Sequence, residues 1–276
     1  KNNINMHNMV MFTSDGASVM LGKNNGVAAL LRNRIPHLSQ QHCVAHKEDL
    51  GIDDAWKKVP IMHDIETLLK TVFTMFSRST VKKASFEELA SVTECDVLAF
   101  RPLNEVRWLS RHFAVRAFIR NYDLLIEYCT EEVEKCNDPI CKYCLKLLKD
   151  PKYRLSLMVL NDVLEELSSL CKIFQRSLLT IMDAMQFAKA RINKIENQYL
   201  GEIVHWNNDI KDLIGKNPGI DTSAILRFIE LLCIHLKNRF SEEDVMDWHV
   251  FDHNAIINSK DFNFGQDCIE KLVKKY

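Results

Sequence analysis

The sequence lacks the features of a secreted or membrane-spanning protein. Its 276 residues contain no uninterrupted apolar stretch near the roughly 20 residues that a membrane helix requires, and no secretion signal. The nine cysteines are odd in number and scattered, which favours free thiols in a reducing compartment over a disulfide framework. We therefore expect a soluble protein of the cytosol or nucleus that has no membrane partner.

The motifs of several enzyme classes are also absent. The sequence has no glycine-rich phosphate loop, no G-x-S-x-G elbow and no H-E-x-x-H pair, so nothing in it supports a kinase or a hydrolase. It begins at Lys1, and a strand-like run follows within ten residues, so we expect a piece of a longer polypeptide. With 47% apolar residues, the chain can bury one large core or two moderate ones.

A basic segment is present although the net charge is only −1. Residues 1–120 carry 16 Lys+Arg against 12 Asp+Glu, whereas residues 121–276 carry 20 against 25. A chance difference between two ordinary surfaces explains this asymmetry equally well. Within RPLNEVRWLSRHFAVRAFIR, however, the single acid Glu105 accompanies five arginines, namely Arg101, Arg107, Arg111, Arg116 and Arg120. Such a density suits contacts with phosphates.

The hydrophobic pattern changes along the chain. Residues 4–14 read as a strand, 26–36 as a short helix stopped by Pro36, and 37–46 as a second extended segment, which predicts an α/β layer. From about residue 111 to 240, apolar residues three and four apart predict long amphipathic helices, one of them running from 160 to 181. We expect a break near GKNPG at 215–219 and an irregular end with a final short helix.

Asp15 follows the first predicted strand and precedes a small-residue turn. A carboxylate fixed at a strand end is suited to holding a divalent cation, although two-metal nucleotidyl transfer needs several such groups. Alternatively, Asp15 or Ser14 caps the helix that follows Gly16.

Cys43 and His46 form a C-x-x-H pair within QHCVAHK. They supply at most two zinc ligands, whereas a structural zinc site usually has four. If the chain turns helical near Ala45, both side chains point into one small space; otherwise His42 and His46 share a face. A buried thiol beside a hydrogen-bonded histidine is the alternative.

Trp108 lies between Arg107 and Arg111. A flat indole flanked by cations can stack on an unpaired base while the arginines hold its phosphates, although many tryptophans simply belong to the core. Four further cysteines, at 129, 136, 141 and 144, offer thiolates for zinc, but helical spacing favours core thiols.

The order of these motifs resembles that of the hAT superfamily of DNA transposases, in particular domesticated hAT-derived proteins that carry zinc fingers or are described as SUMO-ligase-like. SDGASVMLGKNNG followed by HCVAHK carries the resemblance. It implies an incomplete ribonuclease H-like fold over residues 1–110. A large α-helical insertion domain over 111–276, with an irregular C-terminal segment, is implied as well.

The resemblance also implies roles for individual residues. Asp15 matches the second acid of the family's catalytic triad, which would hold Mg²⁺ only in a complete triad, and the other two acids are expected outside Lys1–Tyr276. Cys43 and His46 match the family's C-x-x-H motif. Trp108, preceded by Arg107, matches the tryptophan that stacks on a flipped base.

These implications predict a nuclear, transposase-derived protein that binds DNA through Trp108, Arg107, Arg111 and Arg101. We expect this chain alone to be catalytically inert and to bind no cofactor, with protein partners or a homo-oligomer formed through regions outside it. The alternatives are the middle part of an active Mg²⁺-dependent transposase and a SUMO-ligase-like protein-interaction scaffold.

Overall fold

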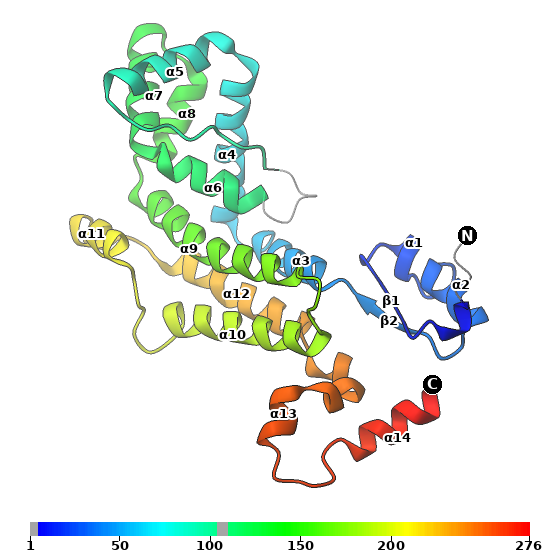
Figure 1. The fold of residues 1–276 in the computed structure, drawn as a ribbon. Coiled ribbons are helices and arrows are strands. Elements are labelled where there is room, and N and C mark those ends of the chain that lie inside the picture. Colours follow the sequence, from blue (N-terminus) through cyan, green and yellow to red (C-terminus); the bar gives the residue numbers. More distant parts are fainter. Residues whose placement is uncertain (1–4, 104–109) are drawn as a thin grey trace.

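The computed structural model describes residues 5–103 and 110–276, and these are mainly helical (Figure 1). Helices account for 71% of the chain, and the described residues form one sheet of two parallel strands. The coarse prediction of an α/β portion joined to a helical portion is confirmed, but in the described residues the strands are confined to 11–42, and residues 44–92, predicted to belong to the α/β portion, are helical. The ribonuclease H-like topology stays a prediction, because two strands do not define it.

The amino-terminal unit alternates strand, helix and strand, as the sequence pattern predicts. It consists of η1 (Met6–Asn8), β1 (Met11–Ser14), α1 (Ser18–Leu21), α2 (Val27–Arg34) and β2 (Ser39–His42). The parallel register places Met11 opposite Ser39 and Ser14 opposite His42. Helix α2 ends shortly before Pro36, because proline disfavours helical geometry in the residue that precedes it.

The remaining elements in the described part of the chain are helices. They are α3 (Val44–Trp56), α4 (Pro60–Arg78), α5 (Thr80–Val92), α6 (Ser110–Arg120), α7 (Tyr122–Cys136), α8 (Pro139–Leu148), α9 (Pro151–Phe174), α10 (Ile181–Tyr199), α11 (Asn208–Lys216), α12 (Ser223–Arg239), η2 (Glu242–Phe251), α13 (His253–Asn258) and α14 (Gln266–Lys275). Proline lies in the first turn of α4, α8 and α9, where its missing N–H costs no hydrogen bond.

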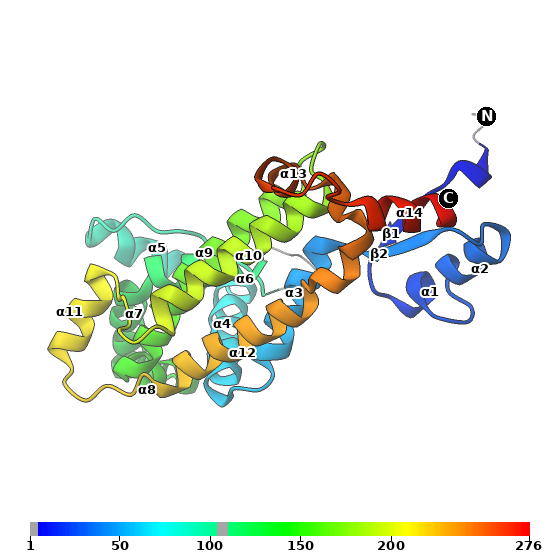
Figure 2. The ribbon, with the colours of Figure 1, turned by 90° about the horizontal axis from the view of Figure 1, so that it is seen from below.

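The helices form one elongated body with the strands at one end. In Figure 1, α4, α5, α7 and α8 gather at the far end, while α9, α10 and α12 cross the middle. Figure 2 shows the same order from below, with α3 packed along α12. A single apolar core extends from Ile52 to Phe240. It therefore crosses the boundary that the sequence predicts at residue 110.

The carboxyl-terminal segment returns to the strands. Helix α14 packs on η2, and the Tyr276 hydroxyl donates to the Val10 carbonyl at 3.3 Å and lies 2.7 Å from Ser39 Oγ. The predicted final short helix is confirmed as α14, but the stretch before it, predicted to be irregular, contains the helical elements η2 and α13. Among the described residues, no helix combines the length and the apolar character that crossing a membrane requires.

One predicted helix is wrong. The apolar spacing over 160–181 predicts a continuous helix, but α9 ends at Phe174 and α10 begins at Ile181. Leu178, which belongs to the apolar stripe, is 93% exposed in the turn between them. The turn forms because Thr180 and Asp183 cap the start of α10 reciprocally, and this satisfies amide groups that a continuous helix would have bonded otherwise.

Candidate functional site

The carboxyl ends of β1 and β2 meet at one edge of the sheet. Ser14 and His42 are opposite each other at the last register position, and the Cys43 amide donates to the Ser14 carbonyl at 2.8 Å. Asp15 and Cys43 therefore follow side by side at this edge, and α3 begins directly afterwards at Val44. Because ligands commonly bind at the carboxyl ends of parallel strands, this edge is the candidate site.

Asp15 is exposed and its carboxylate closes the turn into α1. Its Oδ1 accepts a hydrogen bond from the Ala17 amide at 3.2 Å, and Ala17 is the residue that caps α1. The position of Asp15 immediately after a strand is confirmed. The alternative interpretation, that Asp15 or Ser14 caps α1, is wrong, since Ala17 occupies the cap position without a side-chain hydrogen bond and Asp15 bonds within the preceding turn.

Gly16 lies directly against the His42 ring. A Cβ atom at this position would come within 2.6 Å of His42 Cε1 and 2.8 Å of Nε2. Real Cβ atoms essentially never approach so closely, so a larger residue would displace the ring. The glycine after Asp15 thus lets the turn that carries Asp15 approach β2 closely.

His42 and His46 face each other, with ring centroids 5.3 Å apart. The Nε2 atom of His42 is buried and has no hydrogen-bond partner among the described residues. Burial lowers the pKa of His42, and His46 and Lys47 lower it further, against a smaller opposite effect of Asp15. The surroundings of His42 therefore favour its neutral form.

The C-x-x-H segment spans the start of α3. Cys43 caps α3 and its side chain is half-buried, and His46 in the first turn has His42 as its aromatic neighbour. The interpretation that His42 and His46 share a face is therefore confirmed. The pairing of Cys43 with His46 stays a prediction.

Arg111 lies inside a helix interface and not on a free surface. Its guanidinium donates to Asp49 Oδ1 at 3.1 Å and also pairs with Asp53, and it lies over the Trp56 ring at 5.6 Å. Only 11% of its side chain is exposed. Arg111 therefore fixes the start of α6 on α3, and its guanidinium is not available for the predicted contact with nucleic acid.

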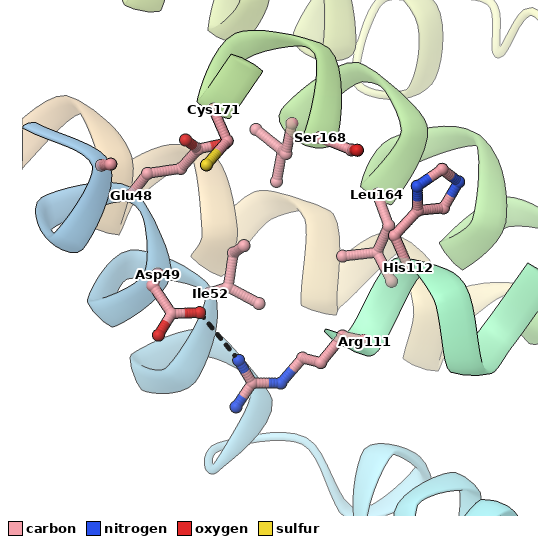
Figure 3. Close-up of a pocket in the computed structure, with 10 residues that line it drawn as sticks. Glu48, Asp49, Ile52, Arg111, His112, Leu164, Ser168 and Cys171 are labelled. Atoms are coloured by element: carbon pink, nitrogen blue, oxygen red, sulfur yellow. Dashed lines mark hydrogen bonds and ion pairs between the residues drawn. The ribbon is translucent and has the colours of Figure 1, made fainter. Parts of the chain in front are cut away.

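A buried polar pocket lies between α3, α6 and α9 (Figure 3). Glu48 from α3, His112 from α6, and Ser168 and Cys171 from α9 line a cavity of about 10 Å³, which is room for about one water molecule. Within the described residues, Glu48 Oε2, His112 Nδ1 and Ser168 Oγ have no hydrogen-bond partner. In Figure 3 the Cys171 sulfur lies beside the Glu48 carboxyl group.

Burial favours the neutral forms of the groups in this pocket. Burial, reinforced by Asp49, raises the pKa of Glu48 well above its usual value, and burial lowers the pKa of His112. Burial also raises the pKa of the Cys171 thiol to about 11. A thiol with a raised pKa is mostly protonated at neutral pH and is a weak nucleophile in that form.

The other predicted residues are distributed differently. Arg101 is exposed in the segment before α6, whereas Arg107 and Trp108 lie outside the described residues. In the described part of the chain, only Glu132, Cys136 and Asp138 bring three ligand atoms within 4.8 Å of one another. Lys82 pairs with Asp138 at 2.5 Å and the Asp138 carboxylate also caps α8, so this carboxylate is already engaged.

Mg²⁺, which the resemblance implies, does not fit the donors present at the strand edge. Mg²⁺ prefers a near-octahedral set of oxygen ligands, and Asp15 supplies the carboxylate here next to two imidazoles. Within the described residues, no second carboxylate completes a metal-binding group with Asp15. No catalytic step through Mg²⁺ is therefore derived for this chain.

Sequence patterns alone did not identify Gly16 and Glu48 as members of these two sites. The role of Gly16 depends on how closely two turns approach, and that of Glu48 on the packing of three helices. Neither has a local signature. No protein-family model matches the chain, and no solved structure matches its fold.

Proposed function

We propose that this chain is a nuclear nucleic-acid-binding protein derived from a hAT transposase. Its amino-terminal unit is the incomplete ribonuclease H-like portion, and its helices form the insertion domain. The observation that carries the proposal is the position of Asp15 at the carboxyl edge of two parallel strands, directly beside the residues of the C-x-x-H segment. The Arg107–Trp108 pair follows in the order that the resemblance requires.

The nucleic acid contacts are assigned to the arginines of the basic segment that are available. Arg101 and Arg116 are exposed, and both belong to residues 101–120. Arg120 pairs with Asp96 at 3.1 Å on the surface, so it contributes less positive potential, and Arg111 is assigned a structural role. Trp108 stacks on an unpaired base in this proposal, and Arg107 holds the adjacent phosphate.

The proposed protein binds nucleic acid without cleaving it. A lone carboxylate binds Mg²⁺ weakly, because the ion dehydrates reluctantly and needs further ligands. Cleavage by the two-metal mechanism requires two ions about 3.5–4 Å apart, which Asp15 alone does not hold. DNA nicking by this chain in the presence of Mg²⁺ would contradict this part of the proposal.

Binding of a labelled single-stranded or hairpin DNA, measured by fluorescence anisotropy over a range of salt concentrations, tests the proposal. Loss of one stacked base costs about 1–3 kcal/mol, so Trp108→Ala is expected to weaken binding roughly 5- to 150-fold. Arg101→Ala is expected to reduce the salt slope by about 0.7, the value for one phosphate of a single strand.

The control for these variants is Lys146→Ala, on the exposed face of α8 at the far end of the molecule. It removes one positive charge and is expected to leave both affinity and salt slope almost unaltered. Absence of binding by the unaltered chain at low salt would overturn the proposal. Equal effects of Lys146→Ala and Arg101→Ala on binding would show that the DNA is held by non-specific electrostatic attraction and not by the basic segment.

A protein-interaction scaffold, SUMO-ligase-like by the same resemblance, is the second candidate. It is favoured by the apolar side chains that the carboxyl-terminal segment leaves exposed, including Ile257 at 79% and Phe262 at 106%. Complexes formed through such a surface persist at high salt, whereas phosphate contacts weaken. Partner binding that survives high salt and the Arg101→Ala change would favour this candidate.

A further inference from the structure

A cavity lined mainly by phenylalanine lies between α4, α5 and the segment that leads towards α6. Its volume of about 320 Å³ falls within the range of roughly 300–1,000 Å³ that is usual for small-molecule sites. Four of its lining residues are phenylalanines, namely Phe73, Phe76, Phe86 and Phe100, and Val97, Leu98 and Ala99 add further apolar surface. Such a lining suits a planar aromatic group.

Helical spacing brings these side chains to one place. The lining residues of each helix are three and four positions apart, so each helix turns one face to the cavity. They are Phe73, Phe76 and Ser77 on α4 and Lys83, Phe86 and Glu87 on α5. Figure 1 shows these two helices side by side at the far end of the body.

Residues 97–100 form the third wall, and they are held in place by α6. The Leu98 amide donates to Asn121 Oδ1 at 3.1 Å, and Asn121 Nδ2 donates to the Leu98 carbonyl at 2.6 Å. Phe100 also stacks on Phe76, with ring centroids 5.1 Å apart and ring planes within 5° of parallel. The third wall is therefore ordered before a ligand binds.

The phenylalanine rings leave one wall free for stacking. Phe76, Phe86 and Phe100 pack on one another, with ring centroids 4.7–5.7 Å apart. Phe73 makes no ring contact with them in the part of the chain that the structure describes, and its side chain is only half-buried. A planar ligand that covered the Phe73 ring would remove apolar surface from water.

The polar residues at the cavity indicate which planar group fits. Lys83 and Glu87 form a 3.7 Å ion pair with 60% and 59% of their side chains exposed, so the rim favours an uncharged ring over an acid or a cation. Arg101 is exposed and directly follows Phe100. A nucleobase meets both conditions, because its ring enters an apolar cavity while its phosphate stays at the surface within reach of a cation.

We propose that this cavity binds an unpaired base of a single-stranded nucleic acid, in addition to the base on which Trp108 stacks. The inference rests on the proposed function, since the same basic segment holds the phosphates. It adds a second site for a base, on the opposite side of Arg101 from Trp108 in the sequence. Every base has a π face, so we expect little sequence preference at this site.

Binding of labelled single-stranded DNA to the whole chain, measured by fluorescence anisotropy, tests the proposal. Phe73→Leu keeps an apolar side chain but removes the ring, and it is expected to weaken binding about 5-fold or more, the lower end of the effect of one stacked base. An oligonucleotide of the same length made only of abasic nucleotides keeps the phosphates. Phe73→Leu and the unaltered chain should bind it equally strongly, because the contact between base and ring is already absent.

The matched control is Phe187→Leu, which removes a 39% exposed ring from α10, outside the cavity lining. It is expected to leave the affinity for both oligonucleotides unaltered. Phe100→Leu removes a ring from the third wall and should weaken binding in the same way as Phe73→Leu. Circular dichroism of the variants shows whether each is folded.

Three results would overturn the proposal. The first is DNA binding that depends on Trp108 and Arg101 but that Phe73→Leu weakens no more than Phe187→Leu does; the DNA-binding proposal then stands without this site. The second concerns the apolar dye 1-anilinonaphthalene-8-sulfonate. If Phe73→Leu weakens binding of the dye but saturating DNA does not displace it from the unaltered chain, the cavity takes an apolar ligand other than a base. The third is the absence of any DNA binding at low salt, which removes the proposed function together with this site.

Discussion

Glu48 is a carboxyl group held in an apolar interior. It is 3% exposed, one of its oxygens has no partner among the described residues, and burial raises its pKa well above the usual value. A carboxyl group whose pKa is higher in the folded state binds more protons there than in the unfolded state. Stability from this group is therefore complete below the unfolded pKa, and it is lost as the pH rises towards the folded pKa.

Glu48→Gln is predicted to reduce the loss of stability that accompanies rising pH. The amide keeps the shape of the neutral acid but cannot ionise, so the free energy of unfolding of the variant should fall less between pH 4.5 and pH 8 than that of the unaltered chain. Urea unfolding at a series of pH values measures the difference. The exposed Glu134→Gln is the control, and identical slopes for all three proteins would contradict the assignment.

Arg111 is predicted to act on stability and not on phosphate binding. Removal of one partner from a buried ion pair leaves an uncompensated charge, so Arg111→Ala is expected to destabilise the chain by about 3 kcal/mol. Its effect on the salt slope of DNA binding should be absent, because no phosphate contact is lost. If Arg111→Ala reduced the salt slope of DNA binding as much as Arg101→Ala does and left stability unaltered, Arg111 would belong to the DNA-binding surface.

At the residue scale, the sequence predicts where a residue lies in the secondary structure better than which residues its side chain contacts. The placement of Asp15 after a strand follows from a local pattern of apolar residues and is confirmed. The partners of Arg111 are 58 and 62 positions earlier in the chain, so its neighbours in sequence only indicate a run of arginines. Whether a charge is free or paired depends on helix packing, which the sequence pattern does not contain.

The start of α10 is an element whose boundary depends on one cap. Thr180 Oγ1 accepts from the Asp183 amide at 3.1 Å, and Asp183 Oδ2 accepts from the Thr180 amide at 3.2 Å. Thr180→Ala is expected to lower the free energy of unfolding by about 1 kcal/mol. Thr180→Ser keeps a hydroxyl group at the cap position and should keep most of this stability. Chemical unfolding measures both; equal stability of the two variants would show that the cap does not hold the helix start.

The packing of α3 on α12 depends on Gly51. A Cβ atom there would lie 2.7 Å from Leu236 Cδ2, whereas nothing lies within 4 Å of a Cβ atom at Gly215 in α11. Gly51→Val is expected to destabilise the chain by about 1–3 kcal/mol through overpacking. Gly215→Ala is expected to be neutral or stabilising by up to about 1 kcal/mol. Thermal unfolding of both distinguishes them, and tolerance of valine at residue 51 would contradict the close packing of these helices.

At the scale of elements, periodicity predicts where helices run but not always where they end. The strand, helix and strand of the amino-terminal unit and the break near 215–219 follow from proline, glycine and apolar spacing. The spacing over 160–181 continues through a turn, because Leu178 happens to fall in phase although it is exposed. The capping pair Thr180–Asp183 is a local signal that could have located this boundary.

At the scale of the whole molecule, one core unites residues on both sides of the predicted domain boundary. Helices α3 to α5 precede residue 110 and pack with the helices that follow it, from Ile52 to Phe240. The boundary at residue 110 is an expectation that follows from the resemblance to the hAT superfamily. Long-range packing, for which single-sequence patterns carry no signal, joins the two parts into one body.

The central claim is that nucleic acid binds where the strand edge and the basic segment lie. Hydrogen exchange of the whole chain, measured with and without a single-stranded oligonucleotide at low salt, tests it most directly. The account predicts slower exchange in peptides that cover residues 13–17, 41–47 and 99–112, and no change in α8 or α11. Protection confined to residues 246–276, or none at all under conditions where the oligonucleotide is bound, would contradict it.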